Sequence, residues 1–182
     1  MSGFVKWLIA RDEARVLILG LDGAGKTSFL ELVKGTFNRA HRPAAPNTVP
    51  PTIGMNLLRT GVADMDVTVW DVGGSMRDIW AQYYADTDAV VFVVDAADRA
   101  RFGEASAALR TILRATDGPV LVLCNKQDRP EAARLSEVLG EVCIPAGLDD
   151  RRPQRVLECC AHRDDGTPRA AIEWVISALE RH

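Results

Sequence analysis

Short runs of hydrophobic residues alternate with helix-like segments along the chain from residue 15 onward. The runs predict six strands, at Val16–Leu19, Ile53–Arg59, Val67–Trp70, Ala89–Val94, Val120–Cys124 and Arg155–Cys159. Apolar residues that recur every three or four positions predict helices at Lys26–Lys34, Arg99–Ala115, Glu131–Leu139 and Arg169–Leu179. Strands that alternate with helices in this way are typical of an α/β domain.

The strands differ in how completely hydrophobic they are. The runs around Ile18, Val91 and Leu121 are nearly unbroken, which predicts central parallel strands buried on both faces. The second and third strands are linked across Gly61 and Asp64, too short a link for a helix, so they should form an antiparallel hairpin. We therefore expect a mostly parallel six-stranded sheet with helices on both faces and one antiparallel hairpin.

Composition narrows the class of protein. A chain of 182 residues is long enough for one domain, and we place it at residues 13–182 after an N-terminal extension, 1–12. A net charge of −3 gives no general attraction to nucleic acid, so no nucleic-acid partner is expected. The four cysteines lack the spacing of a zinc site, which predicts reduced thiols in a cytosolic protein; a redox role for Cys159–Cys160 is the less favoured alternative.

The segment Gly20–Thr27 reads Gly-Leu-Asp-Gly-Ala-Gly-Lys-Thr and fits the phosphate-loop pattern at every position. It follows a predicted strand and opens a predicted helix, which is the context that a phosphate loop requires. Backbone N–H groups and the helix N-terminus could hold phosphate oxygens, Lys26 could neutralise their charge, and the Thr27 hydroxyl could ligate Mg²⁺. The candidate phosphate-binding residues are Asp22, Gly23, Ala24, Gly25, Lys26, Thr27 and Ser28.

The choice of base is predicted by Asn-Lys-Gln-Asp at 125–128, directly after a hydrophobic run. The Asp128 carboxylate can accept two hydrogen bonds from N1 and N2 of guanine, and adenine cannot donate these. Asn125 can connect this segment to the phosphate loop, and the aliphatic part of Lys126 can lie over the base. GTP and GDP are therefore the expected ligands, rather than ATP.

Two further segments stand where a third phosphate and a metal ion would be contacted. Asp71 ends the hairpin and could hold Mg²⁺ through water, and the Gly74 N–H could approach the γ-phosphate. Thr52 follows a proline-rich loop at 37–51 and could give the metal a second hydroxyl. Segments that touch the ligand only when the third phosphate is present behave as switches.

Taken together, these motifs resemble the Arf and Arf-like small GTPases. The resemblance runs from Arg11 onward and rests on Gly20–Ser28, Pro51–Asn56, Trp70–Gly74, Asn125–Asp128 and Cys160–Ala161. It implies a P-loop NTPase G domain in which Cys160 and Ala161 hold guanine O6 through a backbone N–H. It also implies an exchange factor, a GTPase-activating protein and effector proteins as partners, with effectors at Met55, Trp70 and Tyr83.

The chain departs from that family at the residue that orients the attacking water in GTP hydrolysis. Lys26, Thr52 and Gly74 match the family's catalytic positions, but Ser75 replaces the usual glutamine, and the segment from Met76 to Ile79 is short. These changes predict weak intrinsic GTP hydrolysis. The alternatives are a GTP-loaded scaffold that scarcely hydrolyses, or a P-loop kinase with Asp149–Arg152 in its lid, which the guanine motif argues against.

The N-terminal extension, residues 1–12, is the part of the chain that could contact a membrane. Ser2 stands where myristoylated relatives have glycine, so that lipid is not expected. Phe4, Trp7 and Leu8 share one face at helical spacing and could contact a membrane weakly or pack on the domain. The long 37–51 loop and Ser75 resemble two different Arf-like branches, which suggests a cytoplasmic protein that is peripheral at Golgi, ciliary or other internal membranes and acts in vesicle trafficking.

Overall fold

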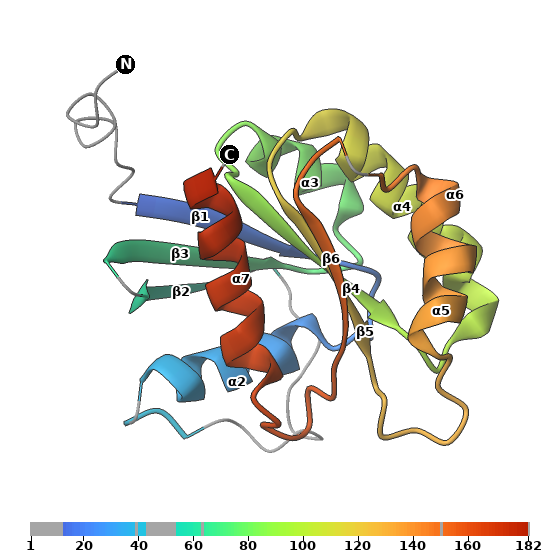
Figure 1. The fold of residues 1–182 in the computed structure, drawn as a ribbon, viewed down its shortest axis with the longest axis horizontal. Coiled ribbons are helices and arrows are strands. Elements are labelled where there is room, and N and C mark those ends of the chain that lie inside the picture. The colour runs from blue at the N-terminus through green and yellow to red at the C-terminus, as the bar shows by residue number, and fades with distance from the viewer. Residues whose placement is uncertain (1–12, 39, 43–53, 63, 150, 182) are drawn as a thin grey trace.

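The sheet holds six strands in the order β2-β3-β1-β4-β5-β6 (Figure 1). The computed structural model describes residues 13–38, 40–42, 54–62, 64–149 and 151–181. Its strands are β1 (Glu13–Leu19), β2 (Met55–Val62), β3 (Met65–Val72), β4 (Ala89–Asp95), β5 (Val120–Asn125) and β6 (Gln154–Glu158). Among the strands of the described residues, only β2 and β3 pair antiparallel, which confirms the predicted mostly parallel sheet with one hairpin.

Helices cover both faces of this sheet (Figure 1). One face packs against α2 (Lys26–Phe37) and α7 (Thr167–Arg181). The other packs against α3 (Arg77–Tyr84), α4 (Phe102–Ala115) and a continuous helical stretch. That stretch comprises α5 (Leu135–Val138), the π turn η3 (Leu139–Cys143) and α6 (Ile144–Ala146), and the 3₁₀ turn η2 (Arg99–Arg101) leads into α4.

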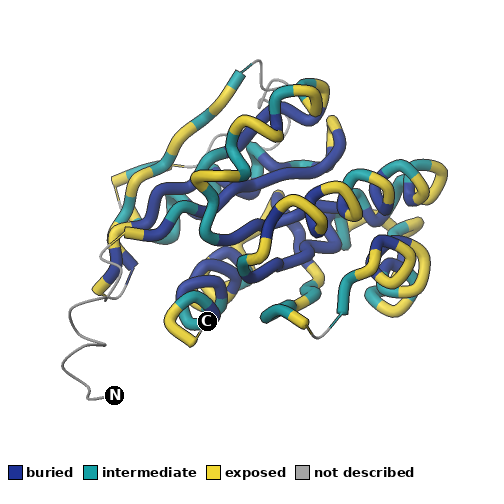
Figure 2. The backbone as a smooth tube through the Cα atoms, turned by 90° about the horizontal axis from the view of Figure 1, so that it is seen from above, coloured by how far each residue is buried: buried dark blue, intermediate teal, exposed yellow. Residues whose placement is uncertain are grey.

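The central strands contribute to two hydrophobic cores because successive side chains of a strand point to opposite faces. Val16 and Ile18 of β1 lie in the core under α2 and α7, whereas Leu17 and Leu19 lie in the core under α3 and α4. The tube in Figure 2 is accordingly dark blue along these strands, and yellow appears on the outer sides of the helices. The prediction that β1, β4 and β5 are central is confirmed.

Several predicted boundaries are wrong, most clearly at the helix after β5 and at the hairpin link. The helix expected at Glu131–Leu139 begins only at Leu135, where the Glu137 carboxylate accepts a hydrogen bond of 2.8 Å from the Arg134 N–H. It then continues to Ala146, and Gly147 closes it in the left-handed conformation at φ 91°. The hairpin link is also shorter than expected, since Gly61 lies within β2 and pairs with Asp66 of β3.

All four cysteines are buried free thiols. Burial raises the pKa of the Cys124, Cys143 and Cys159 thiols to about 12, so these groups stay protonated at neutral pH. Two packed thiols at Cys159 and Cys160 are therefore what the structure shows.

The two arginines considered above for a kinase lid are both held by contacts within the domain. Arg151 pairs with Asp149, with 2.6 Å between Nε and Oδ2. The Arg152 guanidinium donates to the carbonyl oxygens of Thr116, at 2.5 Å, and Leu113, at 2.7 Å. These two carbonyls belong to the end of α4, where backbone oxygens lack helical partners and attract positive charge.

Replacing Arg152 by alanine should lower the free energy of unfolding by about 1.5 kcal/mol, because two charge-assisted hydrogen bonds at the end of α4 are lost. Urea denaturation followed by circular dichroism measures this. The matched control is Arg155→Ala on exposed β6 surface, for which we expect a change within about 0.5 kcal/mol. Equal stability of the two variants would contradict this role for Arg152.

Candidate nucleotide-binding site

Four of the segments predicted to bind nucleotide lie at the carboxyl ends of parallel strands, and these ends meet at one edge of the sheet. The phosphate loop follows β1, the Asp71–Gly74 segment ends β3, Asn125 ends β5, and Cys160–Ala161 follows β6. The two neighbours of β1 in the sheet are β3 on one side and β4 on the other, so the strand order reverses direction at β1. Such a reversal of strand order places the crevice where α/β domains bind ligands.

The phosphate loop turns into α2 at Gly25, which has a left-handed φ of 96°. A Cβ at this position would lie 2.2 Å from Nδ2 of Asn125, so no side chain fits. The first N–H groups of α2 are then presented at the crevice, where they could hold an anion. Lys26 begins the helix and is only 5% exposed, and its Nζ donates to the carbonyls of Gly20 and Leu21, both at 2.9 Å.

Burial lowers the pKa of Lys26 to about 8, while the nearby carboxylates of Asp71 and Asp22 partly oppose this shift. A phosphate beside Nζ would favour the charged form and so raise this pKa. Below pH 8 the lysine is charged with or without ligand. Above pH 8, binding a phosphate must also take up a proton.

Nucleotide affinity should therefore be flat below about pH 8 and fall roughly tenfold per pH unit above it. Fluorescent GDP titrations between about pH 7 and pH 9 measure this. The Lys26→Arg variant keeps its charge over the whole range, so its affinity should show no such fall. Parallel pH profiles for the two proteins would contradict proton uptake at Lys26.

Two oxygen groups that could serve Mg²⁺ lie together. The Thr27 hydroxyl at the start of α2 donates to Oδ2 of Asp71 at 2.7 Å, and Asp71 is fully buried. A hydroxyl and a carboxylate beside a phosphate site suit the hard, oxygen-binding Mg²⁺ ion, so these residues fit the metal. Thr52, the third predicted metal residue, lies outside the described residues.

The segment after β3 lies directly against the phosphate loop. A Cβ on Gly74 would be 2.3 Å from the backbone N of Asp22 and 2.7 Å from Nζ of Lys26. Buried Trp80 of α3 holds this segment, since its indole Nε1 donates to the Gly73 carbonyl at 3.2 Å. Gly74 therefore lies where its N–H could meet a phosphate bound at Lys26.

Ser75 is exposed in the turn that follows Gly74, and α3 begins only two residues later. Its hydroxyl has a much shorter reach than a glutamine amide.

Asn125 links three segments on the base side of the site. Its Nδ2 donates to the Ala24 carbonyl at 2.7 Å, and its Oδ1 accepts from the Ala161 N–H at 2.9 Å. The phosphate loop, the end of β5 and the loop after β6 are thus joined by one side chain. Asn125 is 2% exposed, so it is a fixed part of the structure.

Asp128 lies beside the loop after β6. Its carboxylate is 3.4 Å from Sγ of Cys160 and 3.8 Å from Nδ1 of His162. Burial opposes ionisation, but hydrogen bonds from the Cys160 thiol and from its own backbone N–H hold the pKa of Asp128 below its usual value. An ionised carboxylate is the form that could accept from guanine.

Lys126 has a left-handed backbone, with φ 68°, which is unusual for a residue other than glycine. Its Nζ pairs with Oδ2 of Asp95 at the end of β4, 2.5 Å away. Sequence reasoning missed Asp95, although its position at the carboxyl end of a buried strand was a usable signal.

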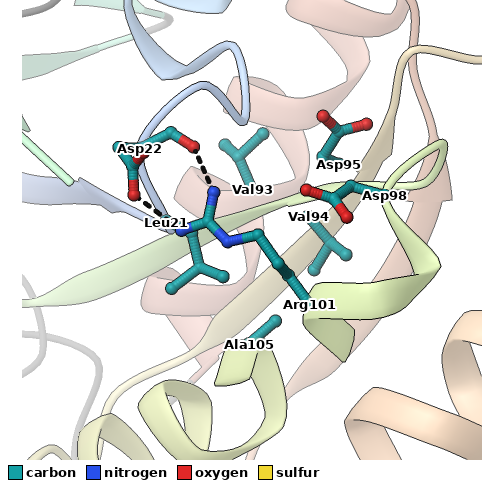
Figure 3. Close-up of a pocket in the computed structure, with 8 residues that line it drawn as sticks. All are labelled: Leu21, Asp22, Val93, Val94, Asp95, Asp98, Arg101 and Ala105. Atoms are coloured by element: carbon teal, nitrogen blue, oxygen red, sulfur yellow. Dashed lines mark hydrogen bonds and ion pairs between the residues drawn. The ribbon is translucent and has the colours of Figure 1, made fainter. Parts of the chain in front are cut away.

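Arg101 was also missed. It is the last residue of η2, directly before α4, and its side chain reaches Asp22 in the phosphate loop (Figure 3).

The three residues expected to face effectors lie on or beside the hairpin. The rings of Trp70 and Tyr83 meet edge to face, with centroids 5.8 Å apart. Met55 is 45% exposed on β2, and the strand register places it on the same face as Leu57 and Trp70.

The comparisons with known proteins agree on one family. A model of the ADP-ribosylation factor family matches residues 1–179. ADP-ribosylation factor-related protein 1 of Bos taurus is 34% identical over 187 aligned positions, which span all of this chain and 92% of that protein. ADP-ribosylation factor-like protein 3 of Saccharomyces cerevisiae is 36% identical over 178 positions, covering 94% of this chain and 88% of that one.

A solved structure shares the fold. The small GTPase Arl6 BBS3 of Trypanosoma brucei, solved with the nucleotide analogue GppNp, superposes with a TM-score of 0.78 at 24% identity. The superposition covers 93% of this chain and 98% of that structure. With the family match extending over nearly its whole length, the chain belongs to the ADP-ribosylation factor family of small GTPases.

Proposed function

We propose that this chain is a Mg²⁺-dependent GTP/GDP switch with slow intrinsic hydrolysis, which recruits effectors in membrane or vesicle trafficking. The observation that supports the switch best is the position of Asn125, which connects the phosphate loop to the segments expected to read guanine. This bridge holds the base-binding and phosphate-binding parts of the site in a fixed relation, so one nucleotide can engage both.

In this proposal the backbone from Asp22 to Ser28 and the Lys26 ammonium hold the phosphates, and Gly74 donates to the third one. Asp128, Lys126 and the Cys160–Ala161 backbone hold the base. Thr27, Asp71 and Thr52 hold the metal. When bound, Mg²⁺ supplies positive charge that neutralises the β- and γ-phosphates.

Slow hydrolysis is supported by the surroundings of Ser75. The residue is exposed in a turn between Gly74 and α3, and a serine side chain there is too short to orient a water at the phosphate. The second candidate function is a GTP-loaded scaffold with essentially no hydrolysis, reset by exchange or by a partner. It is favoured by the same observation.

The two candidates separate in a single-turnover experiment. Protein stripped of nucleotide with EDTA is reloaded with GTP or ATP, and phosphate release is followed after Mg²⁺ addition. We expect loading by GTP only, and release no faster than about 10⁻⁴ per second, the intrinsic scale of a related GTPase that has the glutamine. Release below detection, even with cell extract, identifies the scaffold.

Ser75→Gln tests the reason for slow hydrolysis. We expect less than about a tenfold gain, because α3 begins two residues beyond Ser75 and constrains where a longer side chain can point. Fast release by the unmodified protein would show that another group orients the water.

Partners and location follow from the family as proposals. The exposed face at Met55 and the Trp70–Tyr83 pair would receive effectors, alongside an exchange factor and a GTPase-activating protein. Weak membrane contact would come from Phe4, Trp7 and Leu8 in the 1–12 extension, which lies outside the described residues. Within the described part of the chain, no helix is long and apolar enough to cross a bilayer.

A further inference from the structure

Asp22 is a negative charge inside a loop that is built to hold anions. The structure places its backbone N against Gly74, since a Cβ on Gly74 would approach that atom to 2.3 Å. Gly74 is the residue proposed to meet the third phosphate, and the Asp22 carboxylate also lies close enough to the Lys26 ammonium for the two charges to interact. The carboxylate is therefore within electrostatic range of a phosphate bound at Lys26 and Gly74. A free carboxylate there would repel GTP more than GDP, because GDP has no third phosphate.

Arg101 makes two hydrogen bonds to this aspartate (Figure 3). One guanidinium nitrogen donates to Oδ1 of Asp22 at 2.6 Å, and another donates to the Asp22 backbone carbonyl at 3.1 Å. A guanidinium held at both a side chain and a backbone atom has one defined geometry, unlike a single exposed ion pair. This hydrogen-bonded pairing also lowers the pKa of Asp22.

The same arginine is connected through Glu104 to α3, the helix that follows the Gly74 segment. Its Nε donates to Oε2 of Glu104 at 2.9 Å, and the other oxygen of that carboxylate accepts from Arg77 at 2.6 Å. Arg77 is the first residue of α3, three positions after Gly74. A series of ion pairs therefore connects α3, through Glu104 and Arg101, to Asp22 in the phosphate loop.

We infer that Arg101 is a positioning residue that turns the Asp22 carboxylate away from the third phosphate, and that Glu104 and Arg77 strengthen this hold while α3 is docked. The inference rests on the proposed GTP/GDP switch and deepens it. It makes the preference for GTP over GDP depend on an arginine that lies outside the nucleotide-binding motifs.

The test is the ratio of GTP to GDP affinity, measured by competition against fluorescent GDP. Arg101→Ala should lower this ratio about tenfold, at the low end for one unit charge near a protein surface, and GDP affinity should stay within about twofold. Arg101→Lys should restore part of the ratio. The matched control is Arg99→Ala in the same turn, because Arg99 pairs with Glu137, 2.8 Å away, and not with the phosphate loop.

Two double mutants separate this role from a general loss of structure. In an Asp22→Asn background, Arg101→Ala should change the ratio by less than twofold, since no charge remains to be positioned. Arg77→Ala should lower the ratio by about two- to threefold alone and add little to Arg101→Ala. The effect of Arg101→Ala should also shrink at high salt, because the Asp22 side chain is 60% exposed.

Equal losses of GTP and GDP affinity in Arg101→Ala would overturn the inference and leave only a structural role. A full effect of Arg101→Ala in the Asp22→Asn background would overturn it as well. An unchanged ratio in Arg77→Ala would overturn the connection to α3. Failure of the unmodified protein to bind either guanine nucleotide is a different result, since it removes the proposed function itself.

Discussion

Asp128→Asn is expected to reduce GTP and GDP affinity by about 10³-fold and to create affinity for xanthine nucleotides. An ionised carboxylate accepts two hydrogen bonds from guanine, whereas an amide presents one donor that opposes a donor of the base. Loss of a charge-assisted pair that leaves a donor facing a donor costs roughly 4 kcal/mol. Xanthine has an oxygen where guanine has the amino group, so it can accept from the new amide.

Competition of GDP and XDP against a fluorescent nucleotide measures this exchange of preference. Asp117→Asn, an exposed aspartate at the far end of β5, serves as the control and should bind GDP like the unmodified protein. If Asp128→Asn bound GDP normally, or if the unmodified protein bound ATP and GTP alike, the guanine assignment would be lost.

Gly74→Ala is expected to speed GTP dissociation by about 100-fold while leaving GDP affinity within about threefold. The added methyl would lie 2.3 Å from the Asp22 backbone N and 2.5 Å from the Leu21 carbonyl carbon. Backbone atoms cannot yield as a flexible side chain can, so the Gly74 segment must move off the phosphate loop. GTP then loses its hydrogen bond from the Gly74 N–H, whereas GDP has no third phosphate and loses nothing at this position.

Stopped-flow release of fluorescent GTP and GDP gives both rates from one protein preparation. The matched control is Gly103→Ala in α4, where an added Cβ meets nothing within 4 Å and alanine is the better helix residue. Equal acceleration of GTP and GDP release would show that the methyl damages the whole phosphate loop rather than the approach of one switch.

The sheet was predictable because its central strands have unmistakable patterns. Residues 16–19, 89–94 and 120–124 are hydrophobic without interruption, and strands buried on both faces require this. The helix after β5 was placed less well. Its start depends on a capping contact at Arg134 and its continuation on a π turn at Leu139–Cys143, and neither has a hydrophobic period that a sequence shows.

The site was predictable wherever the chain places its residues next to one another. The phosphate loop and the 125–128 segment are contiguous, so spacing alone identifies them. Arg101 and Asp95 were missed because their partners lie far along the chain, at Asp22 and Lys126. The first pair depends on β4 lying beside β1, and the second on β4 lying beside β5.

The bridge made by Asn125 has a consequence for how a bound nucleotide leaves. One amide fastens the loop after β6 to the phosphate loop, so neither can swing aside while the other stays in place. A protein that displaced the loop after β6 would remove the Ala161 N–H from Asn125, the residue that also bonds Ala24 of the phosphate loop. A partner protein that binds this loop could then weaken nucleotide binding from the base side of the site as well as from the Gly74 side.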